Sequence, residues 1–479
     1  MLFNSLEFII FFPIVVGLYF IISPRFRWIL LLAASYYFYM CWNYKYILLI
    51  LFSTVVDYLA AIAMSRTSQK KFKKVFLVAS LISNLGLLFF FKYFNFFSGS
   101  INAIFDQFNV FYNVPYYDYL LPVGISFYTF QTLSYTIDVY KGKQKPEYHF
   151  GKFALFVSFF PQLVAGPIER SVNLLPQFSQ TFKFEYARIR DGIILMTWGM
   201  FKKVVIADRL SEYVNEVFNH PESYDGFHNI LATLFFSFQI YCDFSGYSDV
   251  AIGAALVMGY HLMKNFNRPY LAKSIGEFWS RWHISLSTWF RDYVYIPLGG
   301  NRVSISRLLF NLYITFLISG LWHGANWTFV IWGALHGIYL VTERLTIRYR
   351  KEIKIHFDKI HLQGLLNLMQ MAITFTLVYV AWIFFRANSI SDTFIIIKNL
   401  FVFNNNLDIN LFQFKADFYL SIIFVTGLIV FEIFSEYFGL VNKIRKQHFF
   451  IKLTLFLVGI FIIIALGKWE GTDFLYFQF

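Results

Sequence analysis

The chain of 479 residues is 58% hydrophobic and only 14% charged, and it contains repeated apolar runs long enough to cross a bilayer, which excludes an ordinary soluble protein. Its net charge of +13 would indicate nucleic-acid binding in a soluble protein, but orientation explains the basic residues of a membrane chain, so we expect no nucleic-acid partner. The two isolated cysteines, Cys41 and Cys242, supply neither a disulfide framework nor a thiolate metal cluster.

The amino-terminal stretch MLFNSLEFIIFFPIVVGLYFIIS predicts a retained first membrane span, because it lacks the basic n-region and small-residue cleavage site of a signal peptide. Apolar segments then recur along the whole chain, and 306–341 is long enough for two short crossings. They run at 7–23, 28–43, 46–64, 75–95, 119–140, 153–168, 193–208, 229–257, 306–341, 365–386, 418–438 and 449–467. Since these runs are continuous and do not alternate, we expect helices and not the strands of a β-barrel.

Basic residues cluster in five connecting segments, which the positive-inside rule places in the cytoplasm. The clusters are Arg25 with Arg27, 65–74, 141–152, 343–359 and 442–447. By contrast, 96–118 has no Lys or Arg and 211–225 has acidic residues without basic ones, so both are predicted outside. This pattern places the amino terminus and the carboxyl-terminal tail 468–479 on the exterior side.

The domain organisation is predicted to be a single membrane domain over residues 1–479. The chain contains no Pro/Gly/Ser-rich linker, low-complexity tract or repeat period. Polar residues concentrate between about 121 and 337, so this central block is where we expect the chemistry.

Two segments of the central block have unusual backbones or side chains for a span. LPVGISFYTFQTLSYTIDVY (121–140) carries many hydroxyl groups, which favour helix packing over substrate contact. FFPQLVAGPIER (159–170) contains two prolines and a glycine, so we expect irregular backbone that is either buried in protein or lines a cavity. A re-entrant segment and a simple kinked helix both remain open for 159–170.

The segment IYCDFSGYSDVAIG (240–253) places Asp243 and Asp249 inside an apolar run. A carboxylate at membrane depth requires a partner, and the candidates are Arg268, Arg281 and serine hydroxyls. A structural ion-pair network is favoured over direct catalysis.

The segment GEFWSRWHISLSTWFRDYVYIPLGG (276–300) repeats aromatic and aliphatic residues at helical spacing, typical of a helix lying in the interface plane. His283 borders this aromatic face. Taken alone, it is more often an interfacial histidine satisfied by water or a carbonyl than a functional one.

The segment ISGLWHGANWTFVIWGALHG (318–337) places His323 and His336 in strongly apolar surroundings. Desolvation keeps an imidazole neutral and able to accept a proton, so catalytic and structural roles are both open for His323, and His336 is the weaker candidate. In one straight helix the two rings would lie roughly 20 Å apart on nearly opposite faces. They cannot share one site unless the backbone breaks.

Six stretches follow one another in the order typical of the membrane-bound O-acyltransferases (MBOAT). They are MLFNSLEFIIFF, LPVGISFYTFQTLSY, PQLVAGPI, YCDFSGYSDVAIG, FWSRWHISLSTWFRDYVYIPLGG and SGLWHGANWTFVIWGALHG. Through them the chain resembles the bacterial alginate O-acetyltransferase type of that family. The DFSGYSD stretch is more similar to the branch that acetylates polysaccharide or peptidoglycan than to the branch that attaches D-alanine to teichoic acid.

The resemblance implies an all-α polytopic fold, with a ring of about 11–13 transmembrane helices around a central funnel and with re-entrant and interfacial helices. It implies transfer of an acyl group, usually acetyl, from a cytoplasmic thioester such as acetyl-CoA to an acceptor outside a bacterial cytoplasmic membrane. It implies no bound cofactor or metal. Alginate, cellulose, another exopolysaccharide and peptidoglycan all fit as acceptors, since an exterior acetyltransferase partner would select the glycan.

The resemblance also assigns residues. The invariant histidine of the family's WHG motif, at the constriction of the funnel, corresponds to His323, and a functional polar residue at the RWH position corresponds to His283. His336 has no such role. Neighbouring side chains expected to bind substrate are Trp322, Asn326, Arg281, Trp282, Asp243 and Ser245.

Related systems end in an aromatic motif with a tyrosine proposed to carry the acyl group to an exterior transferase. In FLYFQF this residue would be Tyr476, and an interfacial aromatic anchor is the alternative.

The mechanism we expect uses a neutral His323 as general base on the incoming hydroxyl, with His283 positioning the thioester or stabilising developing charge. The rival interpretations are a transporter and a scaffold of a polysaccharide export complex. Transporters often show broken helices in corresponding halves, whereas the broken segments here are confined to the middle of the chain.

Overall fold

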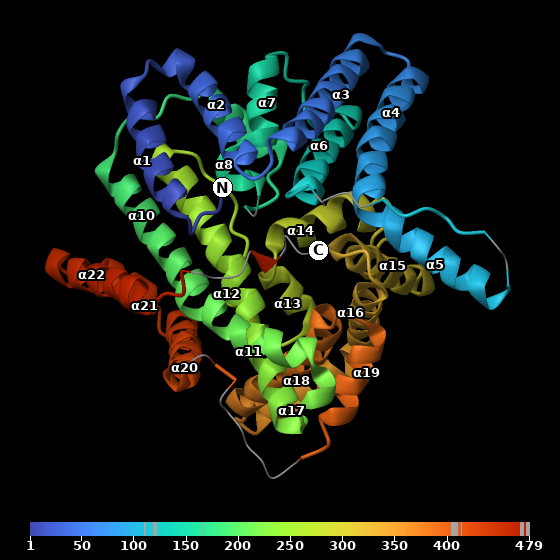
Figure 1. Cartoon of the computed structure of the whole chain (residues 1–479), viewed down its shortest axis with the longest axis vertical. Helices are drawn as coiled ribbons and strands as arrows, with labels where there is room; N and C mark the ends of the chain where they lie inside the picture. Colours follow the sequence, from blue (N-terminus) through green and yellow to red (C-terminus); the bar gives the residue numbers. More distant parts are fainter. Residues whose placement is uncertain are drawn as a thin grey trace. The chain divides into compact units, whose positions relative to one another are not determined.

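The computed structural model describes residues 1–109, 112–117, 122–164, 166–403, 411–412, 414–469 and 474–475. These residues form α-helices joined by short 3₁₀ and π-helical turns, and none of them lies in a β-strand. The prediction of an all-α protein is confirmed (Figure 1).

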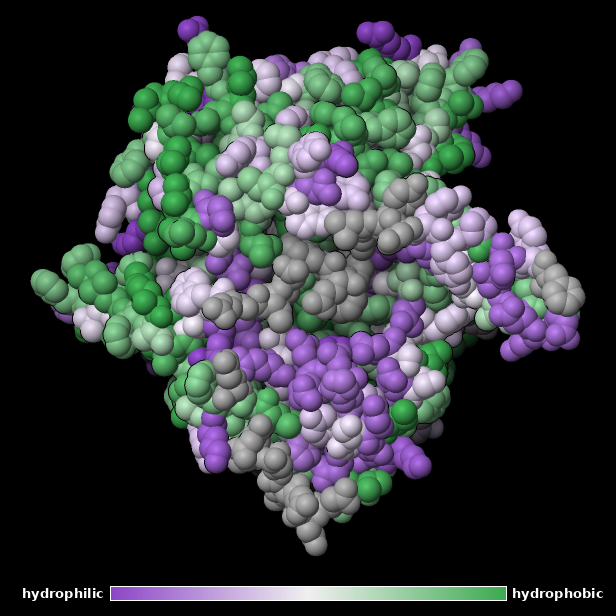
Figure 2. Space-filling view, in the orientation of Figure 1, coloured by the Kyte–Doolittle hydropathy of each residue, from purple (hydrophilic) through white to green (hydrophobic). Residues whose placement is uncertain are grey.

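Among the described residues, six helices are long and apolar enough to cross a membrane, which confirms a polytopic membrane protein. They are Tyr44–Arg66, Lys70–Gln107, Ile305–His323, Gln363–Arg386, Lys415–Tyr437 and Phe449–Leu466. Only 6% of the last of these is buried, so its side chains are left for lipid, and Figure 2 shows this helix as hydrophobic surface. Other predicted segments form shorter helices, such as the 14 residues of Arg27–Met40. The ring and the funnel stay predictions.

The chain folds into two compact units, and the first comprises Met1–Met196 and Ser248–Met263. Its helices are α1 (Leu6–Ile21), α2 (Arg27–Met40), α3 (Ile47–Arg66), α4 (Lys70–Leu88), α5 (Phe94–Gln107), α6 (Ile125–Tyr140), α7 (Phe150–Ser158), α8 (Phe160–Leu163) and α9 (Ser171–Leu174). Two further helices, α10 (Tyr186–Met200) and α12 (Gly226–Met258), have residues in both units. The single domain over 1–479 stays a prediction.

The described residues of 159–170 in the first unit have an irregular backbone, as the prolines and glycine predicted, and those from 159 to 169 are buried. α7 and α8 are separate helices, and residues 166–170 are not helical. The N–H of Phe160 donates to Ser35 Oγ at 3.0 Å, and the carbonyl of Phe156 accepts from Gln162 at 2.9 Å. Side chains thus replace the missing helical hydrogen bonds, and 159–170 is not one kinked helix. A re-entrant path through the membrane stays a prediction.

The second unit comprises Thr197–Tyr247 and Lys264–Phe479. Its helices are α11 (Asp208–Asn219), α13 (Ile275–Arg281), α14 (Ile284–Phe290), α15 (Ile305–His323), α16 (Trp327–Leu345), α17 (Ile347–Lys359), α18 (Gln363–Arg386), α19 (Ile390–Asn399), α20 (Lys415–Tyr437), α21 (Leu440–Arg445) and α22 (Phe449–Leu466). It also contains two π-helical segments, η5 (Phe201–Ala207) and η8 (Arg291–Tyr295).

Candidate active site

The helical hairpin α15–α16 places His323 at a break in the backbone. His323 is the last residue of α15, and the chain passes through Gly324 in extended conformation before α16 begins. Asn326 caps α16 by accepting the N–H of Thr328 at 3.1 Å. The two helices pack along each other (Figure 1). Residues 306–341 are therefore two helices, and the straight-helix separation of His323 and His336 does not apply.

Two glycines allow the hairpin to close tightly. A Cβ atom on Gly320 would clash with the carbonyl oxygen of Phe329, and it would lie 2.9 Å from the Cα of Gly333. A Cβ atom on Gly333 would lie 2.5 Å from the carbonyl oxygen of Phe316. Small residues let helix backbones approach closely. This contact holds the last turn of α15, and with it His323, close to α16.

Aromatic rings surround His323, which is only 3% exposed. Its ring centroid lies 4.9 Å from those of both Trp322 and Trp332, and 5.3 Å from that of Phe385. Because His323 ends α15, the negative end of the helix dipole would stabilise the imidazolium that forms when the ring accepts a proton.

His283 lies at a second break, between α13 and α14. It adopts the left-handed conformation, with φ of 41°, and is fully buried. The prediction of one helix through 276–300 is therefore wrong, because a left-handed residue ends a right-handed helical path. Trp279 and Leu286, two of the residues that recur at helical spacing in this segment, are buried in the protein.

Asn265 holds His283 and the start of α14. Its side-chain Oδ1 lies 3.1 Å from His283 Nδ1, and it accepts from Ser285 Oγ at 2.9 Å and from the Ser285 N–H at 3.3 Å. Its main-chain carbonyl accepts the N–H of Ile284 at 2.9 Å. An amide oxygen only accepts, so the neutral imidazole carries its proton on Nδ1 and Nε2 is the basic nitrogen.

Three histidines of the second unit, His283, His323 and His336, belong to one row of aromatic contacts. Trp322 lies between two of them, with ring centroids 6.4 Å from His283 and 4.9 Å from His323. Trp332 continues the row, 4.9 Å from His323 and 4.8 Å from His336. The structure thus brings together the two predicted catalytic histidines, and the broken backbone places His336 on the other side of Trp332.

His336 has a structural hydrogen bond of its own. Its Nδ1 accepts from Trp279 Nε1 at 3.2 Å, and the residue is fully buried. This contact ties α16 to α13. It is consistent with the family resemblance, which assigns His336 no catalytic role.

Asp243 is paired with Lys203, so the prediction of Arg268 or Arg281 as its partner is wrong. Asp243 Oδ1 lies 2.7 Å from Lys203 Nζ, which also lies 2.7 Å from Asp208 Oδ1. The two arginines instead bind Glu436, at 3.2 and 3.0 Å. Asp243 does belong to an ion-pair network, as its position in an apolar run predicted.

Ser245, two residues further along the same helix, accepts from Lys202 Nζ at 2.8 Å. Lys202 and Lys203 are both buried and lie in η5, a π-helical segment. Such segments occur frequently at functional sites.

The described part of the carboxyl-terminal tail docks on this ion pair. The N–H of Leu475 donates to Asp243 Oδ2 at 2.8 Å. Phe474 is fully buried, with its ring 4.5 Å from Tyr247 and 5.6 Å from Phe244, and Phe244 in turn lies 4.5 Å from His283. Tyr476 itself lies outside the described residues.

The remaining predicted substrate-binding residues make contacts within the protein. Arg281 pairs with Glu277 at 2.8 Å as well as with Glu436, and Trp282 packs 5.1 Å from Trp382. Asn326, besides capping α16, donates to the carbonyl of Asn388 at 3.0 Å. Their role toward substrate stays a prediction.

Sequence reasoning missed Asn265, Lys202 and Lys203. The two lysines had a usable signal, since a pair of cations inside the apolar run MTWGMFKKVVIA requires partners just as Asp243 does. Asn265 had none, because its role depends on a break that periodicity did not predict. Across the described residues, no three His, Cys, Asp or Glu side chains are grouped so that they could hold a metal ion.

Comparison with known proteins places these residues in context. Residues 144–382 match the model of MBOAT, the membrane-bound O-acyltransferase family. This range contains both His283 and His323, whereas Tyr476 lies outside it.

Three relatives illustrate the similarity. The chain is 40% identical to the probable alginate O-acetylase AlgI of Pseudomonas aeruginosa, over 84% of this chain and 75% of that protein. It is 38% identical to the peptidoglycan O-acetyltransferase of Helicobacter pylori, over 84% of this chain and 80% of that protein. The teichoic acid D-alanyltransferase of Bacillus subtilis is 29% identical, over 48% of this chain and 61% of that protein. The resemblance drawn from the motifs is confirmed.

Proposed function

This chain belongs to the membrane-bound O-acyltransferase family and is an acyltransferase of the membrane, and we propose that it moves an acetyl group from cytoplasmic acetyl-CoA across the bilayer for O-acetylation of an extracytoplasmic polysaccharide. The names of the relatives support alginate or peptidoglycan as the acceptor. An exterior acetyltransferase would complete the delivery. The chain itself would work in the bacterial cytoplasmic membrane, with both termini outside.

The observation that carries the proposal is the position of His323, buried among aromatic rings at the end of α15. Acetyl-CoA is too strongly charged to cross hydrocarbon, so donor and acceptor must meet within the protein. The neutral His323 takes the proton of the acceptor hydroxyl, whose oxygen attacks the thioester carbonyl. The carbon–sulfur bond breaks, and the imidazolium returns its proton to the departing CoA thiolate.

The hydrogen bonds of His283 support one of its two expected roles over the other. With its proton on Nδ1 toward Asn265, its Nε2 is an acceptor. An acceptor holds an N–H or O–H group of a substrate and does not stabilise an oxyanion. We therefore assign His283 the role of positioning a substrate. Other groups would stabilise the oxyanion.

The test is CoA release by purified protein, comparing His323→Gln with His336→Gln. Both histidines are buried and both touch Trp332, so the second variant is a matched control. General-base assistance is typically worth about 10²–10⁴-fold, and we expect a loss of that size for His323→Gln only. Extracellular O-acetylation should fall in parallel.

Normal turnover by a folded His323→Gln protein would remove the assignment. A transporter or an export scaffold predicts no CoA release that depends on His323, so the same assay separates the enzyme from both rivals.

A further inference from the structure

A basic pocket of about 440 Å³ lies in the second unit, among α15, α16, α17 and α18. Four of its lining residues are cationic: Arg344, Arg350, Lys351 and Lys354. The one lining carboxylate is that of Glu343, and Arg350 Nη1 pairs with it at 3.2 Å. The pocket therefore keeps an excess of positive charge that no lining side chain balances.

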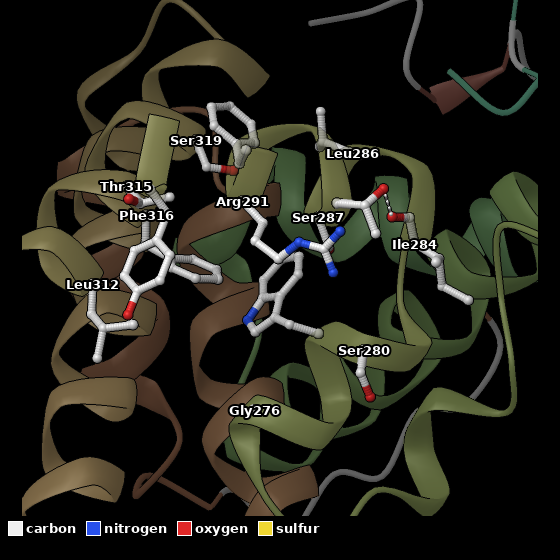
Figure 3. A pocket seen from close by; sticks show the side chains of 14 residues that line it. Gly276, Ser280, Ile284, Leu286, Ser287, Arg291, Leu312, Thr315, Phe316 and Ser319 are labelled. Carbon is white, nitrogen blue, oxygen red and sulfur yellow. Dashed lines mark hydrogen bonds between the residues drawn. The ribbon is translucent and has the colours of Figure 1, made fainter. Parts of the chain in front are cut away.

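An apolar pocket of about 500 Å³ adjoins the basic one, and Leu312 lines both. Figure 3 shows the labelled α15 residues of its wall, such as Phe316, facing α14 residues such as Leu286. Arg291 lies between them, and its charge is already paired with Asp292 at 2.8 Å. The two pockets are also linked by a hydrogen bond of 3.0 Å from the Gly276 N–H to Glu343 Oε2.

Helix α17 has the character of a segment at a membrane surface. It is rich in Lys and Arg, and it exposes large apolar side chains, including Tyr349, Ile353 and Ile355. Such a mixture of cations and exposed apolar groups is typical of helices that lie against anionic headgroups.

We propose that the paired pockets bind one anionic phospholipid, with its phosphate in the basic pocket and an acyl chain along the apolar pocket. The charge of the first pocket complements a phosphate, the walls of the second complement hydrocarbon, and the bilayer supplies a molecule that joins the two. The site differs from that of the proposed acyl transfer, since neither His283 nor His323 lines either pocket. Because residues of α13 and α15 line the apolar pocket, a bound lipid would make the positions of these helices depend on the lipid composition of the leaflet.

The experiment measures lipid bound to the purified full chain by native mass spectrometry, with phosphatidylglycerol and phosphatidylcholine as probes. The test variant is Lys351→Gln with Lys354→Gln. The matched control is Arg348→Gln with Lys359→Gln, which removes the same charge from the same helix away from the pocket. We expect wild type and control to prefer phosphatidylglycerol by about tenfold, and the pocket variant to lose that preference.

Three outcomes would overturn the assignment. Equal losses in both double variants would mean diffuse surface charge, and an unchanged preference in the pocket variant would exclude these lysines. Displacement of the lipid by equimolar inorganic phosphate or CoA would show a site for free phosphate groups. CoA release, measured in parallel, distinguishes failure of this proposal from failure of the proposed function.

Discussion

At the scale of single residues, the chemistry of the site depends on side chains that orient other side chains. Asn265 fixes the tautomer of His283 through its side-chain amide, and it holds the first turn of α14 through that amide and its main-chain carbonyl. A left-handed residue such as His283 carries backbone strain, and strained residues persist only where the surroundings hold them. Asn265 provides part of that restraint, which makes it a positioning residue in the proposed mechanism.

We predict that Asn265→Leu lowers kcat for CoA release by about tenfold to 100-fold, since small displacements of a positioned group cost this much. Asn265→Asp retains an acceptor for His283 Nδ1 and should recover most of the activity. Ser285→Ala, which removes one donor to Asn265 and a longer 3.4 Å contact to His283 but leaves the contact between Asn265 and His283, is the control. Equal activity of the Leu and Asp variants would contradict a positioning role.

At the scale of elements, the hairpin α15–α16 divides a long apolar run into two helices and places His323 of the candidate active site at the break. Its two helices touch through Gly320 and Gly333, and the break between them carries His323. Aromatic contacts from Trp332 reach His323 on one side and His336 on the other. The packing of two helices, and not a local motif alone, therefore sets the geometry.

We predict that Gly320→Ala destabilises the protein by about 1–3 kcal/mol, because the added methyl group would force the helix backbones apart. CoA release should fall as His323 moves. Gly459→Ala in α22 is the control, since nothing lies within 4 Å of its added Cβ atom. Thermal unfolding in detergent measures the first effect, and an unaltered midpoint for Gly320→Ala would refute the close-contact argument.

At the scale of the whole chain, residues near the carboxyl terminus pack against residues from the middle of the sequence. Leu475 and Asp243 are 232 positions apart in the sequence and share a hydrogen bond. The N–H of Lys468 donates to the carbonyl of Val204, a residue of η5, at 2.9 Å. Lys203 supplies the opposing charge that makes Asp243 a strong acceptor at this depth. Phe474 thus lies beside Phe244, whose ring contacts His283.

We predict that Tyr476→Phe abolishes delivery of acetyl to the exterior partner, because the phenol oxygen would carry the acetyl group. Mass spectrometry of protein incubated with acetyl-CoA should find acetyl on Tyr476 and not on this variant. Tyr419→Phe, which alters an exposed tyrosine elsewhere, is the control. Unaltered acetyl delivery by Tyr476→Phe would reject the relay and leave the aromatic anchor.

The amino-acid sequence by itself determined the class of the protein, the all-α architecture, the family and the two histidines that the structure brings together. Continuous apolar runs leave the backbone no other way to satisfy its hydrogen bonds in lipid, and short motifs carry the family resemblance. Only the tertiary structure decided that Asp243 pairs with Lys203, that the helix breaks at His283, and that Trp332 touches both His323 and His336. The reason is physical: a pattern along the chain reports which residues are buried, whereas the choice of partner depends on how distant helices pack.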